Sequence, residues 1–368
     1  MVLDDPIEQQ IMLARLAREF VEQRSSLRTR LEAAQQDTAE NIWRASAGLG
    51  WLGLLLPEEA GGGGASLSDA AVVFEEMGKG LVPGPHLSSG VLCGGILAAT
   101  GAQAAVLETL AAGSEVWALA FTEADARWEP AGVRAEAREA DGGYRLRGVK
   151  QYVQDAGIAD QLLVCARSVE SGELVILAVP ADAEGVVITE MRGWNIQPFF
   201  EVILDEAKAD YLVAAGAEAE RALESALEQA TVLLCAYLIG AAERVYEITL
   251  RYAHTRRQFG QAIARFQRVQ DHLIDMRNAI DRASVATLQA LEDVESDSGR
   301  RTQSISLAKG LVSDGFFFCC EEAHHVHAGI GSDKDYGLYL YSQASHTYYH
   351  YLGSPADHEE RLARVLGF

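Results

Sequence analysis

A change in the spacing of apolar residues is the feature that most constrains how this chain can fold. From 7 to roughly 113 apolar side chains recur about every 3.6 residues, the period of an amphipathic helix. Between about 116 and 212 the spacing becomes two, in short runs separated by Gly, Asp and Pro, which is typical of strands. The helical spacing returns at 218 and continues nearly to 368. An α+β fold is therefore predicted, with a helical lobe, a small β domain and a bundle of long helices.

The same changes of spacing predict three domains in 368 residues, because one core usually organises ~150 residues. We expect an N-terminal α-helical domain over 1–114, a middle β domain of barrel or sandwich type over 115–213, and a C-terminal domain of the four-helix-bundle type over 214–368. The run PEEAGGGG at 57–64 predicts a loop, because consecutive glycines do not sustain a helix. A phosphate-binding loop is the alternative, although the run lacks the G-x-x-x-x-G-K-[ST] pattern.

Charge and cysteine usage restrict the classes of partner. The chain has 53 acidic and 31 basic residues, a formal net charge of -22, which disfavours binding to the phosphates of a nucleic acid. Its five cysteines lack C-x-x-C spacing, so buried reduced thiols are expected. The first residues, Met1 to Asp5, are acidic and lack the basic and apolar regions of a signal peptide. With no apolar run of ~18 residues, we predict a cytoplasmic protein with no membrane partner.

The segment RRQFGQAIARFQ at 256–267 combines a cation, an aromatic ring and an amide at fixed offsets. A guanidinium at Arg256 suits a diphosphate, the ring of Phe259 can lie against a purine or a sugar, and the amide of Gln267 both donates and accepts. The segment resembles the R-x-x-F-G-x-x-[IL]-x-x-x-Q signature of the acyl-CoA dehydrogenase family. The PEEAGG loop and the domain order resemble the same family, so the resemblance covers essentially the whole chain.

The resemblance implies an FAD cofactor that is shared between subunits. In this family FAD lies extended, with its flavin ring between the β domain and the C-terminal bundle and its adenosine end held partly by a neighbouring subunit. Arg256, Phe259 and Gln267 are then implied to contact the diphosphate and adenosine of FAD in an adjacent protomer. At least a dimer follows from this arrangement.

A second stretch, HVHAGIG at 325–331, resembles the family's Q-x-x-G-G-x-G. Gly329 and Gly331 match, and glycine lets backbone N–H groups approach a phosphate closely. His325 replaces the usual Gln and Ala328 a usual Gly, so the resemblance implies a diphosphate contact that is weaker than usual. The nearby histidines suggest a metal as an alternative, but no H-E-x-x-H set accompanies them and no metal is predicted.

Two segments of the β domain resemble the part of the family that contacts the flavin ring. Thr122 lies in a T-E turn, where a hydroxyl or backbone N–H would stabilise the negative charge of the reduced flavin. The run GVKQYVQD at 148–155 resembles G-x-K-x-W-I-T-N, with Tyr152 in place of Trp and Gln154 in place of Thr. A hairpin with an exposed polar strand is the alternative reading of these two positions.

Oxidation of an acyl thioester between its α and β carbons requires a base for the α proton, usually a carboxylate whose pKa is raised by burial. Counting along the family's motifs places its two usual base positions at Leu352 and Ala230, and neither side chain can accept a proton. The nearest carboxylate to the second position, Glu228, lies ~200° round the helix and should point elsewhere. No catalytic residue is assigned, with Glu228 a weak candidate.

A retained cofactor segment without a base resembles the base-lacking subunit of the heteromeric acyl-CoA dehydrogenases of bacterial steroid and side-chain degradation. The resemblance implies FAD-dependent α,β-dehydrogenation of an acyl-CoA, with a homologous partner chain that supplies the Glu and with electron-transfer flavoprotein or a similar acceptor. One alternative is a self-sufficient homo-oligomeric dehydrogenase whose displaced base is Glu228. Another is a helical binding protein that has lost flavin. The sequence does not indicate which acyl chain or steroid is used.

Overall fold

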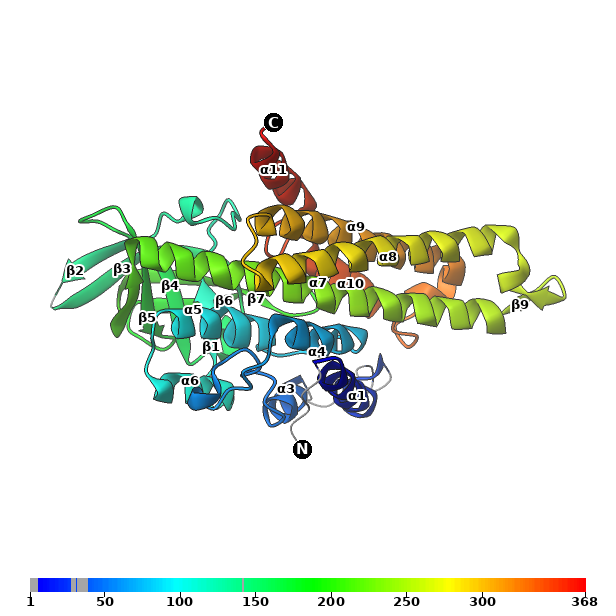
Figure 1. Ribbon diagram of the computed structural model, residues 1–368, viewed down its shortest axis with the longest axis horizontal. Coiled ribbons are helices and arrows are strands. Elements are labelled where there is room, and N and C mark those ends of the chain that lie inside the picture. The colour runs from blue at the N-terminus through cyan, green and yellow to red at the C-terminus, as the bar shows by residue number, and fades with distance from the viewer. Residues whose placement is uncertain (1–5, 28–30, 32–38, 141) are drawn as a thin grey trace.

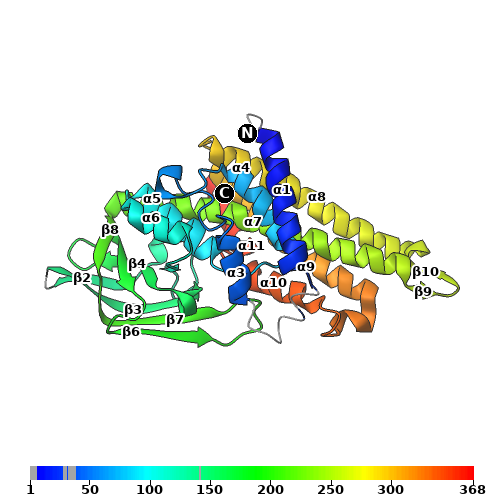
Figure 2. The same ribbon diagram turned by 90° about the horizontal axis from the view of Figure 1, so that it is seen from below.

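A computed structural model describes residues 6–27, 31, 39–140 and 142–368 of the chain. The molecule is elongated, with the strands gathered at one end and the long helices extending to the other (Figure 1). Seen from below, helices α1, α3 and α4 lie against the middle of the bundle (Figure 2). The segment Met1 to Asp5 lies outside the described residues. Its acidic composition was the basis for predicting that the chain has no signal peptide.

The N-terminal part is helical, as the spacing of its apolar residues predicts. Helix α4 begins with a capping box in which Ser66 and Asp69 bond to each other's backbone N–H groups. The glycine run contains only the 3-10 turn Glu58–Ala60 and continues as a loop, as predicted. The helices are α1 (Pro6–Arg24), α3 (Ala39–Ala47), α4 (Leu67–Lys79), the π-helical η2 (His86–Cys93), α5 (Gly94–Ala99) and α6 (Ala104–Ala111).

The strands of the middle part belong to one mixed sheet, with the order β6-β7-β3-β2-β4-β5-β8 and with β1 parallel to β4. Side chains from six of these strands meet in one apolar cluster, so the sheet encloses a core as a barrel or a sandwich does. The strands are β1 (Trp117–Ala120), β2 (Glu136–Ala140), β3 (Gly143–Gln154), β4 (Gln161–Ser168), β5 (Leu174–Pro180), β6 (Val186–Met191), β7 (Phe199–Lys208) and β8 (Tyr211–Ala215).

The C-terminal part is a bundle built around α7. A close approach to α4 is possible because Gly240 lacks a side chain: a Cβ there would lie 1.8 Å from the carbonyl oxygen of Glu75. Among the described helices α7 alone is long and apolar enough to cross a membrane, but 83% of its apolar window is buried inside the protein. The helices are α7 (Gly216–Thr255), α8 (Gln267–Glu295), α9 (Arg301–His327), α10 (Tyr339–Tyr349) and α11 (Pro355–Leu366).

Candidate cofactor-binding and active site

The segment 256–267, which we call the arm, forms a hairpin between α7 and α8 that projects from the end of the bundle remote from the sheet (Figures 1 and 2). Its strands are β9 (Arg257–Gln258) and β10 (Gln261–Ala262). Phe259 has a φ of 51° and is 90% exposed. Arg256 and Gln267 are exposed as well. The arm therefore offers a cation, a ring and an amide to a ligand or chain outside this protomer, and this donor set fits a nucleotide diphosphate.

The glycine-containing stretch lies near the base of the arm. The ring of His327 stacks on Tyr252 in the last turn of α7, with centroids 4.4 Å apart. His325 is exposed and stacks on His272 of α8 at 5.8 Å. The structure thus brings the arm and the stretch 325–331, which contains Gly329 and Gly331, to the same end of the bundle. No group of three His, Cys, Asp or Glu among the described residues is placed to hold a metal.

The two predicted β-domain segments are adjacent because Lys150 joins them. Its buried ammonium donates to the carbonyl oxygen of Phe121 at 3.1 Å and to Glu123 Oε1 at 2.7 Å. Burial lowers the pKa of Lys150, and the Glu123 carboxylate opposes this shift. The neighbouring Thr122 is buried and its hydroxyl donates to the carbonyl oxygen of Gln151 at 2.5 Å. The hydroxyl proton of Thr122 is therefore already used within the chain.

Tyr152 and Gln154 lie on a distorted part of β3. The pairing with β7 shifts between Lys150 and Val153, and Tyr152 has a φ of 57° with its side chain 38% exposed. Gln154 is buried, and its Nε2 donates to Gln197 Oε1 at 2.8 Å, while its own Oε1 has no hydrogen-bond partner among the described residues. The exposed-hairpin alternative is therefore wrong for Gln154, because its side chain faces the interior.

Both expected base positions are buried and apolar. Leu352 is 2% exposed and Ala230 is fully buried. Leu352 has a φ of 59°, which a leucine adopts only at an energetic cost. Its carbonyl oxygen accepts a hydrogen bond from His358 Nε2 at 2.9 Å. The loop that would carry a base thus has a defined, strained conformation, but it offers no proton acceptor at residue 352.

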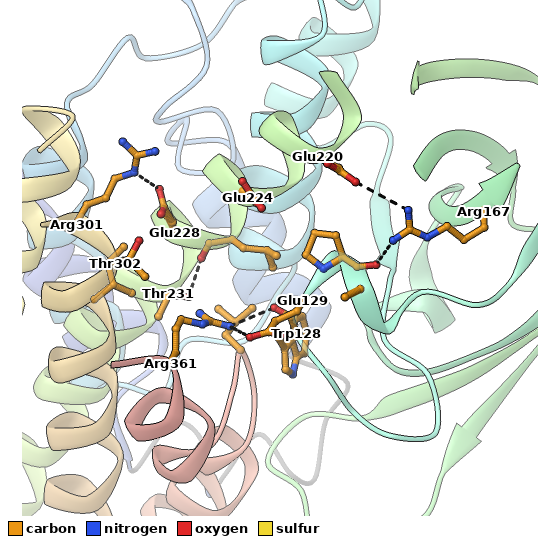
Figure 3. A pocket seen from close by; sticks show the side chains of 15 residues that line it. Trp128, Glu129, Arg167, Glu220, Glu224, Glu228, Thr231, Arg301, Thr302 and Arg361 are labelled. Atoms are coloured by element: carbon orange, nitrogen blue, oxygen red, sulfur yellow. Dashed lines mark hydrogen bonds and ion pairs between the residues drawn. The ribbon is translucent and has the colours of Figure 1, made fainter. Parts of the chain in front are cut away.

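A cavity of about 520 Å³ opens beside Leu352, between α7, α9, α11 and the loop after β1 (Figure 3). Glu228 lines this cavity together with Leu352, a neighbour that counting along α7 from Ala230 does not predict. The reason is that Leu352 belongs to a loop that reaches the face of α7 on which Glu228 lies. Glu228 Oε2 pairs with Arg301 Nε at 3.0 Å, and burial raises the pKa of this carboxyl.

The remaining charges of the cavity come mostly in pairs across elements. Arg361 of α11 lies 3.6 Å from Glu129 in the loop after β1, and Arg167 of β4 lies 3.9 Å from Glu220 of α7 (Figure 3). Glu224 lines the cavity on the same face of α7. The cavity therefore has more carboxylates than guanidinium groups, which disfavours a polyanionic ligand.

Three residues that no motif marks are also placed at this site. Trp128 lines the cavity, and its ring lies 4.9 Å from that of Tyr351. Lys309 is fully buried in α9 and donates to the loop that contains Tyr351. A single buried lysine in a helix is the only sequence signal that could have drawn attention to this group.

Three family models together match most of the chain. The acyl-CoA dehydrogenase N-terminal domain matches residues 7–119, the middle domain 118–207 and the C-terminal domain 220–367. The chain therefore belongs to the acyl-CoA dehydrogenase family. The family, fold class and enzyme class predicted from the sequence are confirmed.

Relatives and solved structures agree with this assignment. The chain is similar to acyl-CoA dehydrogenase FadE27 of Mycobacterium tuberculosis, with 28% identity over 346 residues, 91% of this chain and 90% of the relative. A variant of the Tcur3481-Tcur3483 steroid ACAD has 28% identity and a TM-score of 0.86, covering 98% of both chains. PigA with FAD and proline, at 22% identity, shares the fold with a TM-score of 0.90, covering 100% of this chain and 99% of that one.

Proposed function

We propose that this chain is the base-lacking subunit of a heteromeric, FAD-dependent acyl-CoA dehydrogenase. One observation carries the proposal: the arm is exposed and carries the nucleotide-binding residue types, whereas both base positions, Leu352 and Ala230, are buried and apolar. A homologous partner chain would supply the catalytic Glu. The 28% identity to a steroid ACAD named by two components supports a heteromeric assembly.

In this proposal FAD, when bound, would supply the hydride acceptor for dehydrogenation of the acyl-CoA. Arg256 would neutralise part of the diphosphate charge, Phe259 would pack against the adenosine and Gln267 would hydrogen bond with it. The backbone at Gly329 and Gly331, with His325 beside it, adds N–H donors to the diphosphate. Exposed groups such as Arg256, Phe259 and Gln267 suit this role, because binding then costs little intramolecular rearrangement.

Several further features belong to the same proposal. Domain limits at 1–114, 115–213 and 214–368 are supported by the start of β1 at Trp117 and of α7 at Gly216. Electron-transfer flavoprotein or a similar acceptor would reoxidise the flavin, and the assembly would be a heterotetramer in the cytoplasm. Thr122 and Gln154 are engaged in hydrogen bonds within this chain, whereas Tyr152, with its side chain 38% exposed, would be accessible to the flavin of the assembly.

Co-expression with a homologous chain that has Glu at either base position tests the proposal. We expect a complex with one FAD per two chains, measured by flavin absorbance against protein mass. Arg256→Gln should weaken FAD binding roughly 10- to 100-fold, because a charged hydrogen bond contributes roughly 1.5–3 kcal/mol. Arg268→Gln is the matched control, since this exposed arginine lies one residue beyond the arm and is 3.8 Å from Asp271.

Two results would contradict the proposal. One is a homo-oligomer of this chain that oxidises an acyl-CoA without a partner. The other is an Arg256→Gln complex that retains FAD as well as the Arg268→Gln control does. A colourless protein that FAD cannot reconstitute, with or without a partner, would instead favour the flavin-free binding protein.

The raised pKa of Glu228 and its place beside Leu352 favour one second candidate, a self-sufficient dehydrogenase with Glu228 as its base. Exchange of the α proton of an acyl-CoA with solvent deuterium separates the two. If Glu228 is the base, Glu228→Gln abolishes the exchange in the protein without a partner. The proposed heteromer predicts no exchange in the partner-free wild type.

A further inference from the structure

Six aromatic side chains form a continuous group between the sheet and the helices. Trp128 contacts Phe121 at 6.0 Å and Tyr351 at 4.9 Å between ring centroids. Tyr351 in turn lies 5.6 Å from Phe199 and 6.2 Å from Tyr348. The series ends at Tyr237 of α7, 5.7 Å from Tyr348. We call these six residues the aromatic plug, because three come from the β domain and three from the helical domain.

The plug lies beside the residues that were expected to contact a flavin ring. Phe121 directly precedes Thr122, and Phe199 is the strand partner of Gln154. The cavity that remains next to Gln154 measures about 20 Å³. A single water needs ~10–15 Å³, whereas pockets for cofactors measure ~300–1,000 Å³. A tricyclic ring therefore has no room in this cavity unless the residues that line it move, among them Tyr237 and Tyr348 of the plug.

Polar contacts hold the backbone of the plug from behind. The Lys309 ammonium is fully buried and donates to the carbonyl oxygens of Tyr348 and Tyr349 at 3.3 Å and of Gly353 at 2.9 Å. His358 Nε2 donates to the carbonyl oxygen of Leu352 at 2.9 Å. Four carbonyl groups around Tyr351 are thus fixed, so the backbone that carries its ring cannot shift without breaking buried hydrogen bonds.

Trp128 separates the plug from the open cavity of Figure 3. Its ring lines that cavity and also packs edge-to-face on Tyr351, at 77°. Leu352 lines the same cavity beside it. Trp128 therefore bounds a cavity that is large enough for a ligand, and Tyr351 packs behind it against Phe199 and Tyr348.

We propose that Trp128 and Tyr351 exclude the isoalloxazine ring from this chain, so that the chain contacts FAD only through its arm and only in a partner. The inference rests on the proposed function, because the resemblance to the family places a ring between these domains. It assigns the specificity of the site to two residues, Trp128 and Tyr351, that were not among the site residues expected from the sequence.

Lumiflavin tests this inference, because it has the tricyclic ring but no diphosphate and so does not depend on the arm. Titration of the purified chain, followed by flavin fluorescence, should show no saturable binding to wild type. The Trp128→Ala, Tyr351→Ala double variant should show saturable binding, with a Kd at least 10-fold below the highest lumiflavin concentration used with wild type. Tyr351→Phe is the matched control, since it keeps the ring in place and should behave as wild type.

Saturable binding of lumiflavin to wild type would overturn the inference, as would a double variant that unfolds cooperatively yet gains no binding. If the double variant does not fold, the Trp128→Val variant replaces it, because this variant leaves Tyr351 and the Lys309 contacts intact. It should gain measurable lumiflavin binding, and an absence of binding would overturn the inference. Failure here leaves the proposed function standing if Arg256→Gln still lowers FAD in the complex with the partner.

Discussion

Replacing Lys309 with Met measures how strongly the loop at 348–353 is held. Met has a similar length, so it fills the space of the lysine but donates no hydrogen bond. The three protons of the ammonium are shared among Ser313 Oγ at 2.8 Å and the carbonyl oxygens of Gly353, Tyr348 and Tyr349, so the loss of the ammonium removes three donors from these acceptors. A buried acceptor without a partner costs roughly 1–3 kcal/mol, so three such losses together cost roughly 6 kcal/mol.

The lysine itself reduces this effect, because its burial is unfavourable. Desolvation lowers the pKa of Lys309 from 10.5 to about 8. At about 1.4 kcal/mol for each pKa unit, the buried charge costs the folded state roughly 3 kcal/mol near neutral pH. The difference between the two effects predicts that Lys309→Met is less stable than wild type by roughly 3 kcal/mol at pH 7.

The pH dependence distinguishes this reasoning from a simple packing defect. Because the folded-state pKa lies below the unfolded value, the unfolded chain binds more protons between about pH 8 and 10.5, and the stability of wild type rises through that window. The variant lacks this titration. The gap in unfolding free energy should therefore widen by up to roughly 3 kcal/mol between pH 8 and 10.5.

Urea unfolding followed by circular dichroism at pH 7, 8, 9 and 10 is the assay. Lys208→Met, at an exposed position on β7, is the control and should stay within about 0.5 kcal/mol of wild type. The reasoning is refuted if Lys309→Met is as stable as wild type. If the difference in unfolding free energy between wild type and Lys309→Met stays constant over this pH range, the argument from the buried charge is refuted. The argument from the lost hydrogen bonds is not affected by that result.

Three further predictions concern stability. Gly240→Ala should cost more than about 3 kcal/mol by thermal unfolding, since its Cβ would lie 1.8 Å from a carbonyl oxygen; Gly310→Ala, with nothing within 4 Å, should be neutral or stabilising. Ser354→Ala removes the capping box of α11 and should cost about 1 kcal/mol in urea unfolding, and an unchanged midpoint would refute that role. Burial lowers the pKa of His358 to about 4, so the unfolded chain binds more protons between pH 4 and 6.5 and stability falls as the pH falls through that window. His358→Gln should flatten this dependence in thermal melts, and an unaltered slope would contradict the assignment.

The domain order was predictable because it depends on local patterns. The short strand-like runs between about 116 and 212 include 144–147, 161–165, 174–179 and 186–188, and these lie within β3, β4, β5 and β6. Alternating burial over a few residues is enough to define a strand. The arm was recognisable for a similar reason, since Arg256, Phe259 and Gln267 occur within twelve residues.

The neighbours of the candidate site were not predictable in this way. Glu228 was placed by counting along one helix, but its position in the same cavity as Leu352 depends on a loop that follows three further helices, α8, α9 and α10. The sequence suggests that the hydroxyl of Thr122 is available to a ligand, whereas in the structure it donates to the carbonyl oxygen of Gln151. Such contacts follow from how elements pack, which a single segment does not encode.

The sequence by itself determined the family and the three-part architecture, and it places Leu352 and Ala230 at the expected base positions, because periodicity and motif spacing are properties of short segments. Only the tertiary structure decided that Tyr351 contacts Trp128 and that Lys309 holds the loop that carries Tyr351. It also decided that the arm projects away from the rest of the chain. The physical reason is that close packing joins residues far apart in the chain, and the space left for a ligand depends on all of them at once.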